Sequence, residues 1–184
     1  MTDHAELVQI VDRTMAEAVR KGGSWIACRI GCHECCIGPF PITQLDAVRL
    51  REGLTELKTR EPERAARVLH RAHVYVDHLT AAFPDNPLEA ALTVDEAAEN
   101  EFCPALDPAT GACDLYAARP ITCRTFGPAV RFPGEPAARV CELCFHGATD
   151  DEIIACSVEI DTAPEAGGET IVAFALAGGC EAMH

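Results

Sequence analysis

The sequence contains few aromatic side chains and no long apolar run. Aromatic residues make up 5% of the 184 residues although hydrophobic residues make up 48%, so a core has to be built mainly from Ala, Leu, Val and Ile. No stretch approaches the ~20 apolar residues of a membrane-spanning helix. The N-terminal segment lacks the basic and apolar regions of a signal peptide. We therefore expect a cytoplasmic protein with no membrane contact, long enough for one domain with its own core.

Basic side chains are also scarce. Lys and Arg number 15 against 29 Asp and Glu, which gives a formal net charge of −14. Nonspecific nucleic-acid binding needs a basic surface, so we expect no nucleic-acid partner. The sequence has no Gly-rich phosphate loop and no set of Ser, His and Asp that suggests a triad. Whether the chain is an enzyme stays open, and no physiological protein partner is indicated.

Cysteine, in contrast, is abundant. The chain has eleven, and an odd number in a reducing compartment favours metal ligation over a closed disulfide framework. Four of them lie within the nine residues CRIGCHECC: Cys28, Cys32, Cys35 and Cys36. Disulfides need a particular Cα separation and dihedral angle, which so tight a loop does not readily provide. Thiolates converge easily on zinc, at ~2.3 Å, and also hold iron–sulfur clusters. This loop is predicted to bind metal.

Two details of the loop refine this prediction. Cys35 and Cys36 are adjacent, and side chains of neighbouring residues tend to diverge, which suits two sites or a bridged pair better than one site. His33 lies between cysteines, where it can orient the loop through a backbone hydrogen bond. An extra metal ligand and a proton carrier are the alternatives for this histidine.

A second group of cysteines follows about seventy residues later. Cys103 precedes a proline, Cys113 follows the turn-forming segment DPATGA, and Cys123 lies in RPITCRTF. Pro120 can open a short helix that places Cys123 in its first turn, where the helix dipole favours a thiolate. Arg119 and Arg124 flank Cys123 and are predicted to offset thiolate charge. We interpret the three cysteines as ligands that complete the site of the first group.

A third pair, Cys141 and Cys144, has the C-x2-C spacing that lets two sulfurs reach one ion from a single turn. Redox pairs share this spacing, but no strand–helix context supports a thioredoxin-like interpretation. We predict both as ligands, without His146. Cys156 is interpreted as an apolar core residue and Cys180 lies near a loose end, so neither is predicted to ligate.

The rest of the chain reads as mainly α-helical. Helices are predicted from Thr2 or Asp3 to about Arg20, from Thr43 (an N-cap) to about Lys58, and from Pro62 to near Pro84. The third has one apolar stripe, made of Ala65, Val68, Leu69, Ala72, Val76 and Leu79. A short helical piece is expected at Asp95–Asn100.

The C-terminal part is ambiguous. Thr149 and Glu152 form a capping box for a helix, but apolar residues alternate from Ile154 to Ile160 as in a half-buried strand. The loop APEAGG then leads to TIVAFALA. We favour the strand, so the sequence allows a small C-terminal β hairpin.

These residues resemble a bacterial family, the YkgJ-like or CxxCxxCC cysteine cluster proteins. The resemblance rests on CRIGCHECC at 28–36 and CPALDPATGACDLYAARPITCRTF at 103–126. The family is described as zinc- or iron-chelating. The resemblance implies a ligand set of seven cysteines: Cys28, Cys32, Cys35, Cys36, Cys103, Cys113 and Cys123. A similar cluster occurs in the longer flagellin lysine methylases, where it resembles an iron–sulfur site that serves methyl transfer.

Two functions follow as hypotheses. The first is a protein that chelates zinc or an iron–sulfur cluster, with zinc slightly preferred. The second is an iron–sulfur enzyme of redox or methyl-transfer type. The spacing of Cys28, Cys32 and Cys35 resembles that of radical adenosylmethionine enzymes, but two helices follow it where those enzymes have strand–helix units. We predict one irregular, mainly α domain over residues 1–184, held together by cysteine–metal coordination between residues 28 and 144.

Overall fold

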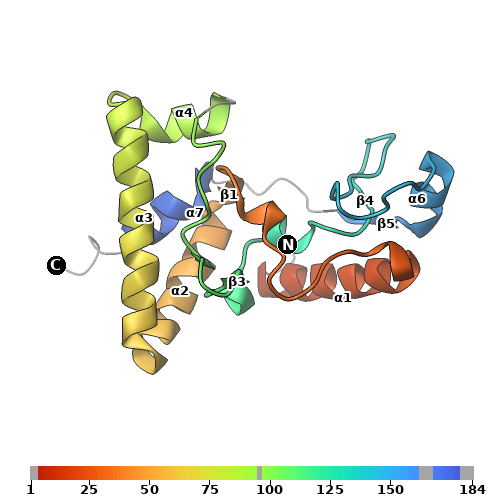
Figure 1. The fold of residues 1–184 in the computed structure, drawn as a ribbon, viewed down its shortest axis with the longest axis horizontal. Coiled ribbons are helices and arrows are strands. Elements are labelled where there is room, and N and C mark those ends of the chain that lie inside the picture. Colours follow the sequence, from red (N-terminus) through yellow and green to blue (C-terminus); the bar gives the residue numbers. More distant parts are fainter. Residues whose placement is uncertain (1–3, 95–96, 162–167, 179–184) are drawn as a thin grey trace. The chain divides into compact units, whose positions relative to one another are not determined.

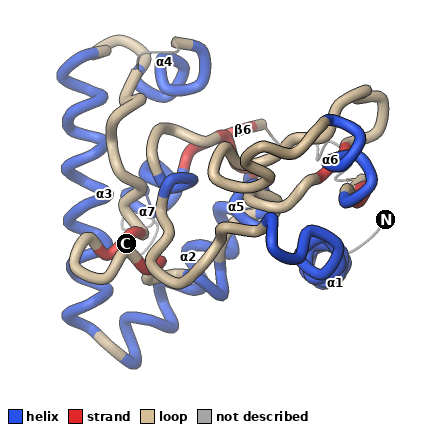
Figure 2. The backbone as a smooth tube through the Cα atoms, turned by 45° about the vertical axis from the view of Figure 1, so that its right-hand side comes forward, coloured by secondary structure: helices blue, strands red, loops and turns tan. Residues whose placement is uncertain are grey.

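A computed structural model describes residues 4–94, 97–161 and 168–178. These residues form seven α-helices and three sheets of two strands each (Figure 1). Most of the chain between α4 and α6 is loop (Figure 2). The predicted mainly α class is confirmed.

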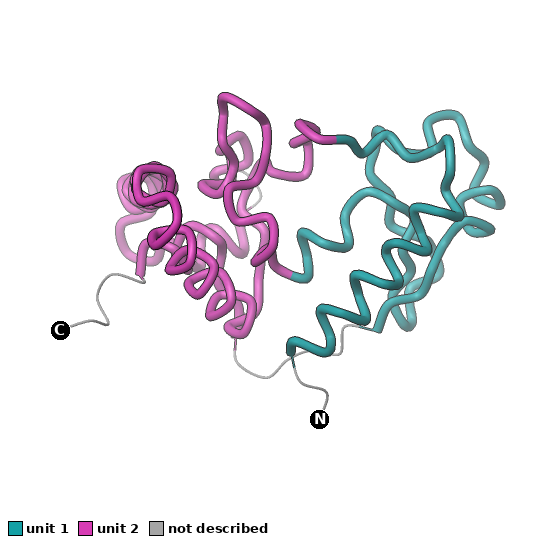
Figure 3. The backbone as a smooth tube through the Cα atoms, turned by 90° about the horizontal axis from the view of Figure 1, so that it is seen from below, with its two compact units in different colours: residues 1–29, 121–165 teal, residues 30–120, 166–184 magenta. Residues whose placement is uncertain are grey.

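The chain divides into two compact units (Figure 3). Unit 1 consists of residues 1–29 and 121–165, and unit 2 of residues 30–120 and 166–184. The division falls inside the first cysteine group, with Cys28 in unit 1 and Cys32, Cys35 and Cys36 in unit 2. That both units together act as one metal-binding domain stays a prediction.

Unit 2 is built around three helices: α2 (Gln44–Arg60), α3 (Pro62–Ala82) and α7 (Val172–Ala177). The Thr43 side chain caps α2 by accepting a hydrogen bond from the Asp46 amide, and Pro62 opens α3. The helices pack on one another around a core that includes Leu50, Val68 and Leu176. Burying each such side chain contributes about 1.5–3 kcal/mol.

Short strands and a fourth helix complete unit 2. Strand β1 (Pro41–Thr43) pairs antiparallel with β6 (Glu169–Ile171), and β2 (Leu106–Asp107) pairs antiparallel with β3 (Ala112–Cys113). Helix α4 (Pro87–Thr93) packs on α3 and β6. Two 3-10 turns, η2 (Glu34–Cys36) and η3 (Tyr116–Ala118), lie next to cysteines.

Unit 1 is organised on α1 (His4–Gly22), which is followed by the turn η1 (Gly23–Trp25). Val8, Val11, Met15 and Ala18 form its buried face, at the helical spacing that the sequence shows. This face packs against α5 (Ile121–Arg124) and the parallel pair of β4 (Val130–Arg131) and β5 (Val158–Glu159). Helix α6 (Asp150–Cys156) completes the unit.

Three predicted helices are confirmed as α1, α2 and α3, although residues 1–3 lie outside the described part of the chain. The C-terminal hairpin is wrong, because β5 pairs with β4 and β6 pairs with β1. The capping box of Thr149 and Glu152 starts α6, which replaces the predicted strand up to Cys156, while Val158–Glu159 is strand β5 as predicted. Val172–Ala177 is helix α7 rather than strand. The helical piece expected at Asp95–Asn100 lies earlier, at Pro87–Thr93, where Pro87 opens α4; residues 95–96 are not described.

No helix within the described residues is both long enough and apolar enough to cross a membrane.

Candidate metal centres

In unit 2, the cysteine loop lies against the segment that carries Cys103. The Cys103 amide donates a hydrogen bond to the Cys36 carbonyl oxygen (2.7 Å), and the Gly38 amide donates one to the Glu101 carbonyl oxygen (2.8 Å). These two bonds hold the backbones of Cys36 and Cys103 side by side, although 67 residues separate them in sequence. The sequence predicted that the first and second groups meet, and for this pair the backbone contact confirms it.

The β2–β3 hairpin brings in Cys113. Cys113 pairs with Leu106, whose amide donates to the Cys103 carbonyl oxygen (2.9 Å). At the turn, Gly111 has a φ of +67°, and a Cβ there would lie 2.8 Å from the Gly31 carbonyl oxygen. Only glycine fits so close an approach of two backbones. The turn chemistry of DPATGA therefore packs the hairpin onto the cysteine loop.

In unit 2, the charges of four thiols affect one another. The hydrogen bond between Cys35 and Cys36 raises the pKa of Cys36, and burial and the charges of Cys35, Cys103 and Cys113 raise it further. The same bond lowers the pKa of Cys35 to about 6. Burial raises the pKa of Cys103 to about 12 and also raises that of Cys113. Thiolates so close repel one another, and a bound cation would offset that repulsion.

Asp114, the residue after Cys113, has a buried carboxylate that is held by two arginines of α3. Asp114 accepts hydrogen bonds from Arg64 Nε (2.5 Å) and Arg71 Nη2 (2.6 Å), and only 2% of its side chain is exposed. Arg71 Nε also donates to the Pro104 carbonyl oxygen (2.8 Å). These bonds attach both sides of the hairpin to α3, so the positions of Cys103 and Cys113 are set by the helix core.

In unit 1, the Sγ atoms of Cys28 and Cys144 lie 3.9 Å apart. Two thiolates bound at ~2.3 Å to one tetrahedral ion are about 3.8 Å apart, so this pair has the spacing of two ligands of a single metal ion. Cys141 belongs to the same turn, because the Cys144 amide donates to its carbonyl oxygen (2.8 Å). The predicted C-x2-C turn is thus formed, next to Cys28.

Backbone geometry keeps this turn in place. Phe145 has a φ of +57°, which is uncommon for a bulky residue. Its amide donates to the Trp25 carbonyl oxygen (3.0 Å), and its ring stacks on Trp25 with centroids 6.3 Å apart. Gly127, whose carbonyl oxygen accepts from the Cys141 amide, has a φ of +110°, and a Cβ on it would lie 2.6 Å from Cys28 Sγ. The missing side chain of Gly127 leaves room for the Cys28 sulfur.

Cys123 and Cys32 are the remaining cysteines predicted as ligands. Cys123 is half-buried in α5 of unit 1, and Cys32 is half-buried in the unit 2 loop. His33 Nδ1 donates to the Gly31 carbonyl oxygen (3.0 Å), which confirms its loop-orienting role. Cys156 ends α6 half-buried, and Cys180 lies outside the described residues.

The two arginines beside Cys123 act differently from one another. The charge of Arg119 lowers the pKa of Cys35 and Cys113, which agrees with the predicted charge offset, and its guanidinium lies over the Tyr116 ring. The buried Arg124 instead donates to both Asp12 carboxylate oxygens (2.7 and 2.8 Å). Its charge is paired with a carboxylate of α1, and that Arg124 also offsets a thiolate stays a prediction.

The donor set fits a metal ion, although the thiols are only partly converged. Among the described residues, no group of three or more His, Cys, Asp or Glu side chains has metal-ligand geometry. The structure joins none of the ten described cysteines in a disulfide. The Cys28–Cys144 spacing and the space at Gly127 match one thiolate-bound ion. In unit 2, the hydrogen bond to Cys35 raises the pKa of Cys36, and burial raises the pKa of Cys103 and Cys113. Both groups are therefore suited to thiolate ligation.

Comparison with known proteins assigns the family. Residues 27–144 match the model of the CxxCxxCC family, described as "Putative zinc- or iron-chelating domain". The chain belongs to this family. No curated protein and no solved structure matches the chain. The matched range of the CxxCxxCC family includes all nine cysteines predicted as ligands and ends at Cys144, so Cys141 and Cys144 fall within the family region rather than beyond it.

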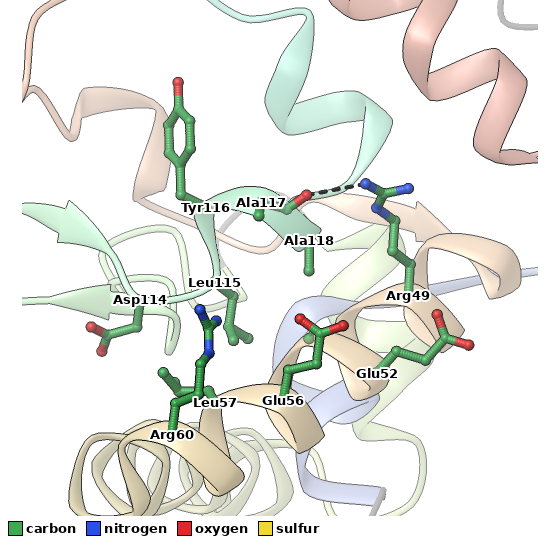
Figure 4. Close-up of a pocket in the computed structure, with 11 residues that line it drawn as sticks. Arg49, Glu52, Glu56, Leu57, Arg60, Asp114, Leu115, Tyr116, Ala117 and Ala118 are labelled. Carbon is green, nitrogen blue, oxygen red and sulfur yellow. Dashed lines mark hydrogen bonds between the residues drawn. The ribbon is translucent and has the colours of Figure 1, made fainter.

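A cavity of about 310 Å³ opens in unit 2 between α2 and η3 (Figure 4). Its lining includes five charged side chains, Arg49, Glu52, Glu56, Arg60 and Asp114, and no cysteine. Arg49 points to the Ala117 carbonyl oxygen, to which it donates a hydrogen bond (3.1 Å). This cavity is separate in its lining from the thiol groups of the CxxCxxCC region, so it is not part of a thiolate site.

From the sequence, we did not predict Gly127 and Phe145 as residues that shape the unit 1 group, or Tyr75 as a buried residue of α3. Gly127 lies in the segment FGP, which signals a turn. The need for glycine there comes from the Cys28 sulfur, which is distant in sequence. Tyr75 lies between Ala72 and Leu79 in the buried stripe of α3, so the helical spacing of that stripe could have identified it.

Proposed function

We propose that the protein binds zinc in two separate cysteine sites, one in each unit. The site in unit 1 would use Cys28, Cys141 and Cys144, with Cys123 as the fourth ligand. The site in unit 2 would use Cys36, Cys103 and Cys113, with Cys35 or Cys32 as the fourth. Nine cysteines provide for two four-sulfur sites with one left over, and the adjacent Cys35 and Cys36 need not both bind the same ion.

The distance of 3.9 Å between Cys28 Sγ and Cys144 Sγ carries this proposal. Thiolates that share one tetrahedral ion are about 3.8 Å apart. In a four-iron cluster each thiolate binds a different iron, so the sulfurs are spread around the whole cluster and lie farther apart. The spacing therefore favours a single ion over a cluster in unit 1, and zinc is the ion most often held by four thiolates.

The cysteines of unit 2 support the proposal through their burial and the charge of their thiolates. Cys103 and Cys113 pack against the hydrophobic core of unit 2, where unneutralised thiolates are unfavourable. A zinc ion would let these thiols lose their protons and would link the cysteine loop to the hairpin. Bound metal would then add to the free energy of folding, as in other small metal-binding proteins.

The test is elemental analysis together with an absorption spectrum of the full chain purified without oxygen. We expect a colourless protein with about two zinc ions per chain. A brown protein with broad absorbance near ~400 nm and about four irons per cluster would reject zinc. That outcome would favour the redox or methyl-transfer enzyme that resembles the cluster part of flagellin lysine methylases.

Single substitutions test the division into two sites. Cys144→Ser should remove the zinc ion of the unit 1 site, and Cys113→Ser should remove the zinc ion of the unit 2 site. Cys156→Ser is the matched control, because Cys156 is a half-buried cysteine of unit 1 outside the family region. If Cys144→Ser and Cys113→Ser each abolished all metal binding in folded protein, the two sites would not be independent.

A further inference from the structure

The segment that carries Cys103 runs along one face of α3. Arg71 Nε donates to the Pro104 carbonyl oxygen (2.8 Å), and His78 Nδ1 lies 3.1 Å from a Glu101 carboxylate oxygen. Residues 71 and 78 are two turns apart and so lie on the same face of the helix. Arg71 contacts Pro104 and the later His78 contacts the earlier Glu101, so α3 and the segment from Glu101 to Pro104 run in opposite directions. Tyr75 follows Arg71 by one turn and so lies on this face between the two contacts. We infer that the segment between Glu101 and Pro104, which includes Cys103, passes next to it.

Tyr75 presents a buried hydroxyl without a partner. Its side chain is 4% exposed, and among the described residues its hydroxyl oxygen makes no hydrogen bond. Buried hydroxyl groups are nearly always hydrogen-bonded, so an exception calls for an explanation. An ordinary phenol keeps its proton at neutral pH, so this hydroxyl is available as a hydrogen-bond donor.

We propose that the Tyr75 hydroxyl donates a hydrogen bond to the Cys103 sulfur when Cys103 ligates the metal ion of unit 2. This inference rests on the proposed zinc sites. A thiolate sulfur accepts hydrogen bonds more strongly than a neutral thiol, because the bond to it is charge-assisted. Tyr75 would be a positioning residue: it orients the Cys103 ligand and stabilises its negative charge in a buried place. Glu101 is the competing acceptor, but its carboxylate already pairs with His78.

The experiment compares Tyr75→Phe with Tyr116→Phe in the full chain. The first change removes the hydroxyl and keeps the ring in the core. The chain has only two tyrosines, and Tyr116 is 61% exposed with its ring under Arg119. Chelator competition should show zinc binding of Tyr75→Phe at one site weakened by about 10- to 100-fold, as for other residues that support metal ligands. Tyr116→Phe should bind like the parent chain.

Two spectroscopic measurements separate a hydrogen bond to sulfur from a packing effect. In the cobalt-substituted protein, loss of a donor raises the energy of the sulfur lone pairs, so the thiolate-to-cobalt absorption of Tyr75→Phe should move to longer wavelength. In the cadmium-substituted protein, the ¹¹³Cd resonance of the unit 2 site should shift while that of the unit 1 site stays. Cys113→Ser, which removes the unit 2 resonance, assigns the signals.

The outcomes are distinct. If the parent chain binds neither zinc nor cadmium, the proposed function fails and this inference with it. If it binds both metals, but Tyr75→Phe keeps the parent affinity, cobalt absorption and ¹¹³Cd spectrum, the hydrogen bond is refuted and the zinc sites stand. Weakened binding with unchanged spectra would also refute it, since Tyr75 would then act through packing alone.

Discussion

Replacement of Gly127 by alanine should empty the unit 1 site and leave the unit 2 site loaded. A Cβ at this position would lie 2.6 Å from Cys28 Sγ, whereas non-bonded heavy atoms pack at about 3.5–4.0 Å. The sulfur would have to retreat by about 1 Å. Metal–sulfur distances vary by only about 0.2 Å, so a displaced Cys28 could no longer share an ion with Cys144.

The backbone conformation of Gly127 adds a second free-energy cost to its replacement, and the variant Gly134→Ala measures this cost by itself. Gly127 has a φ of +110°, and a residue with a Cβ in such a conformation costs about 1–3 kcal/mol. Gly134, also in unit 1, has a φ of +84° and would place a Cβ in open space. Gly134→Ala should therefore destabilise the protein by a similar amount without touching a cysteine.

The assay is zinc content by elemental analysis, together with ¹¹³Cd spectra of the cadmium-substituted variants. Gly127→Ala should retain about one ion per chain and Gly134→Ala about two. Circular dichroism verifies that both variants are folded. If folded Gly127→Ala kept as much metal as Gly134→Ala, then Cys28 would not be a ligand at the position that the structure gives it, and the argument from the 3.9 Å spacing would fall.

Three further predictions concern the stability of the folded chain and the pH dependence of zinc binding. Asp114→Asn should lower the free energy of unfolding by about 2 kcal/mol, since its charged hydrogen bonds to Arg64 and Arg71 are lost; an unchanged midpoint in urea would contradict this. Thr149→Ala should cost about 1 kcal/mol in thermal unfolding through loss of the α6 cap, and Thr149→Ser should restore it. Because the pKa of Cys103 is raised to about 12, its thiol is protonated at neutral pH and metal binding has to release that proton. Zinc affinity measured by chelator competition should thus fall as the pH is lowered, and a pH-independent affinity would exclude Cys103 as a ligand.

Local sequence signals predicted three helices of the fold, α1, α2 and α3. The apolar spacing along α1 and α3, the Thr43 cap of α2 and the proline at the start of α3 all act within a few residues, so they can be read without knowledge of the partner elements. The C-terminal part shows the limit of such signals. There a capping box and an alternating pattern overlap: the cap starts α6, which ends at Cys156, and the end of the alternating stretch pairs as strand β5.

The sequence by itself determined which side chains are available for metal binding and three long helices, α1, α2 and α3. Tertiary structure decided which thiols meet. Cys28 and Cys32 belong to one loop, yet Cys28 faces Cys144 in unit 1 while the other loop cysteines lie with Cys103 and Cys113 in unit 2. The physical reason is that these groupings depend on backbone hydrogen bonds between residues far apart in the chain, such as Cys103 to Cys36. The spacing of cysteines along the sequence carries no record of those bonds.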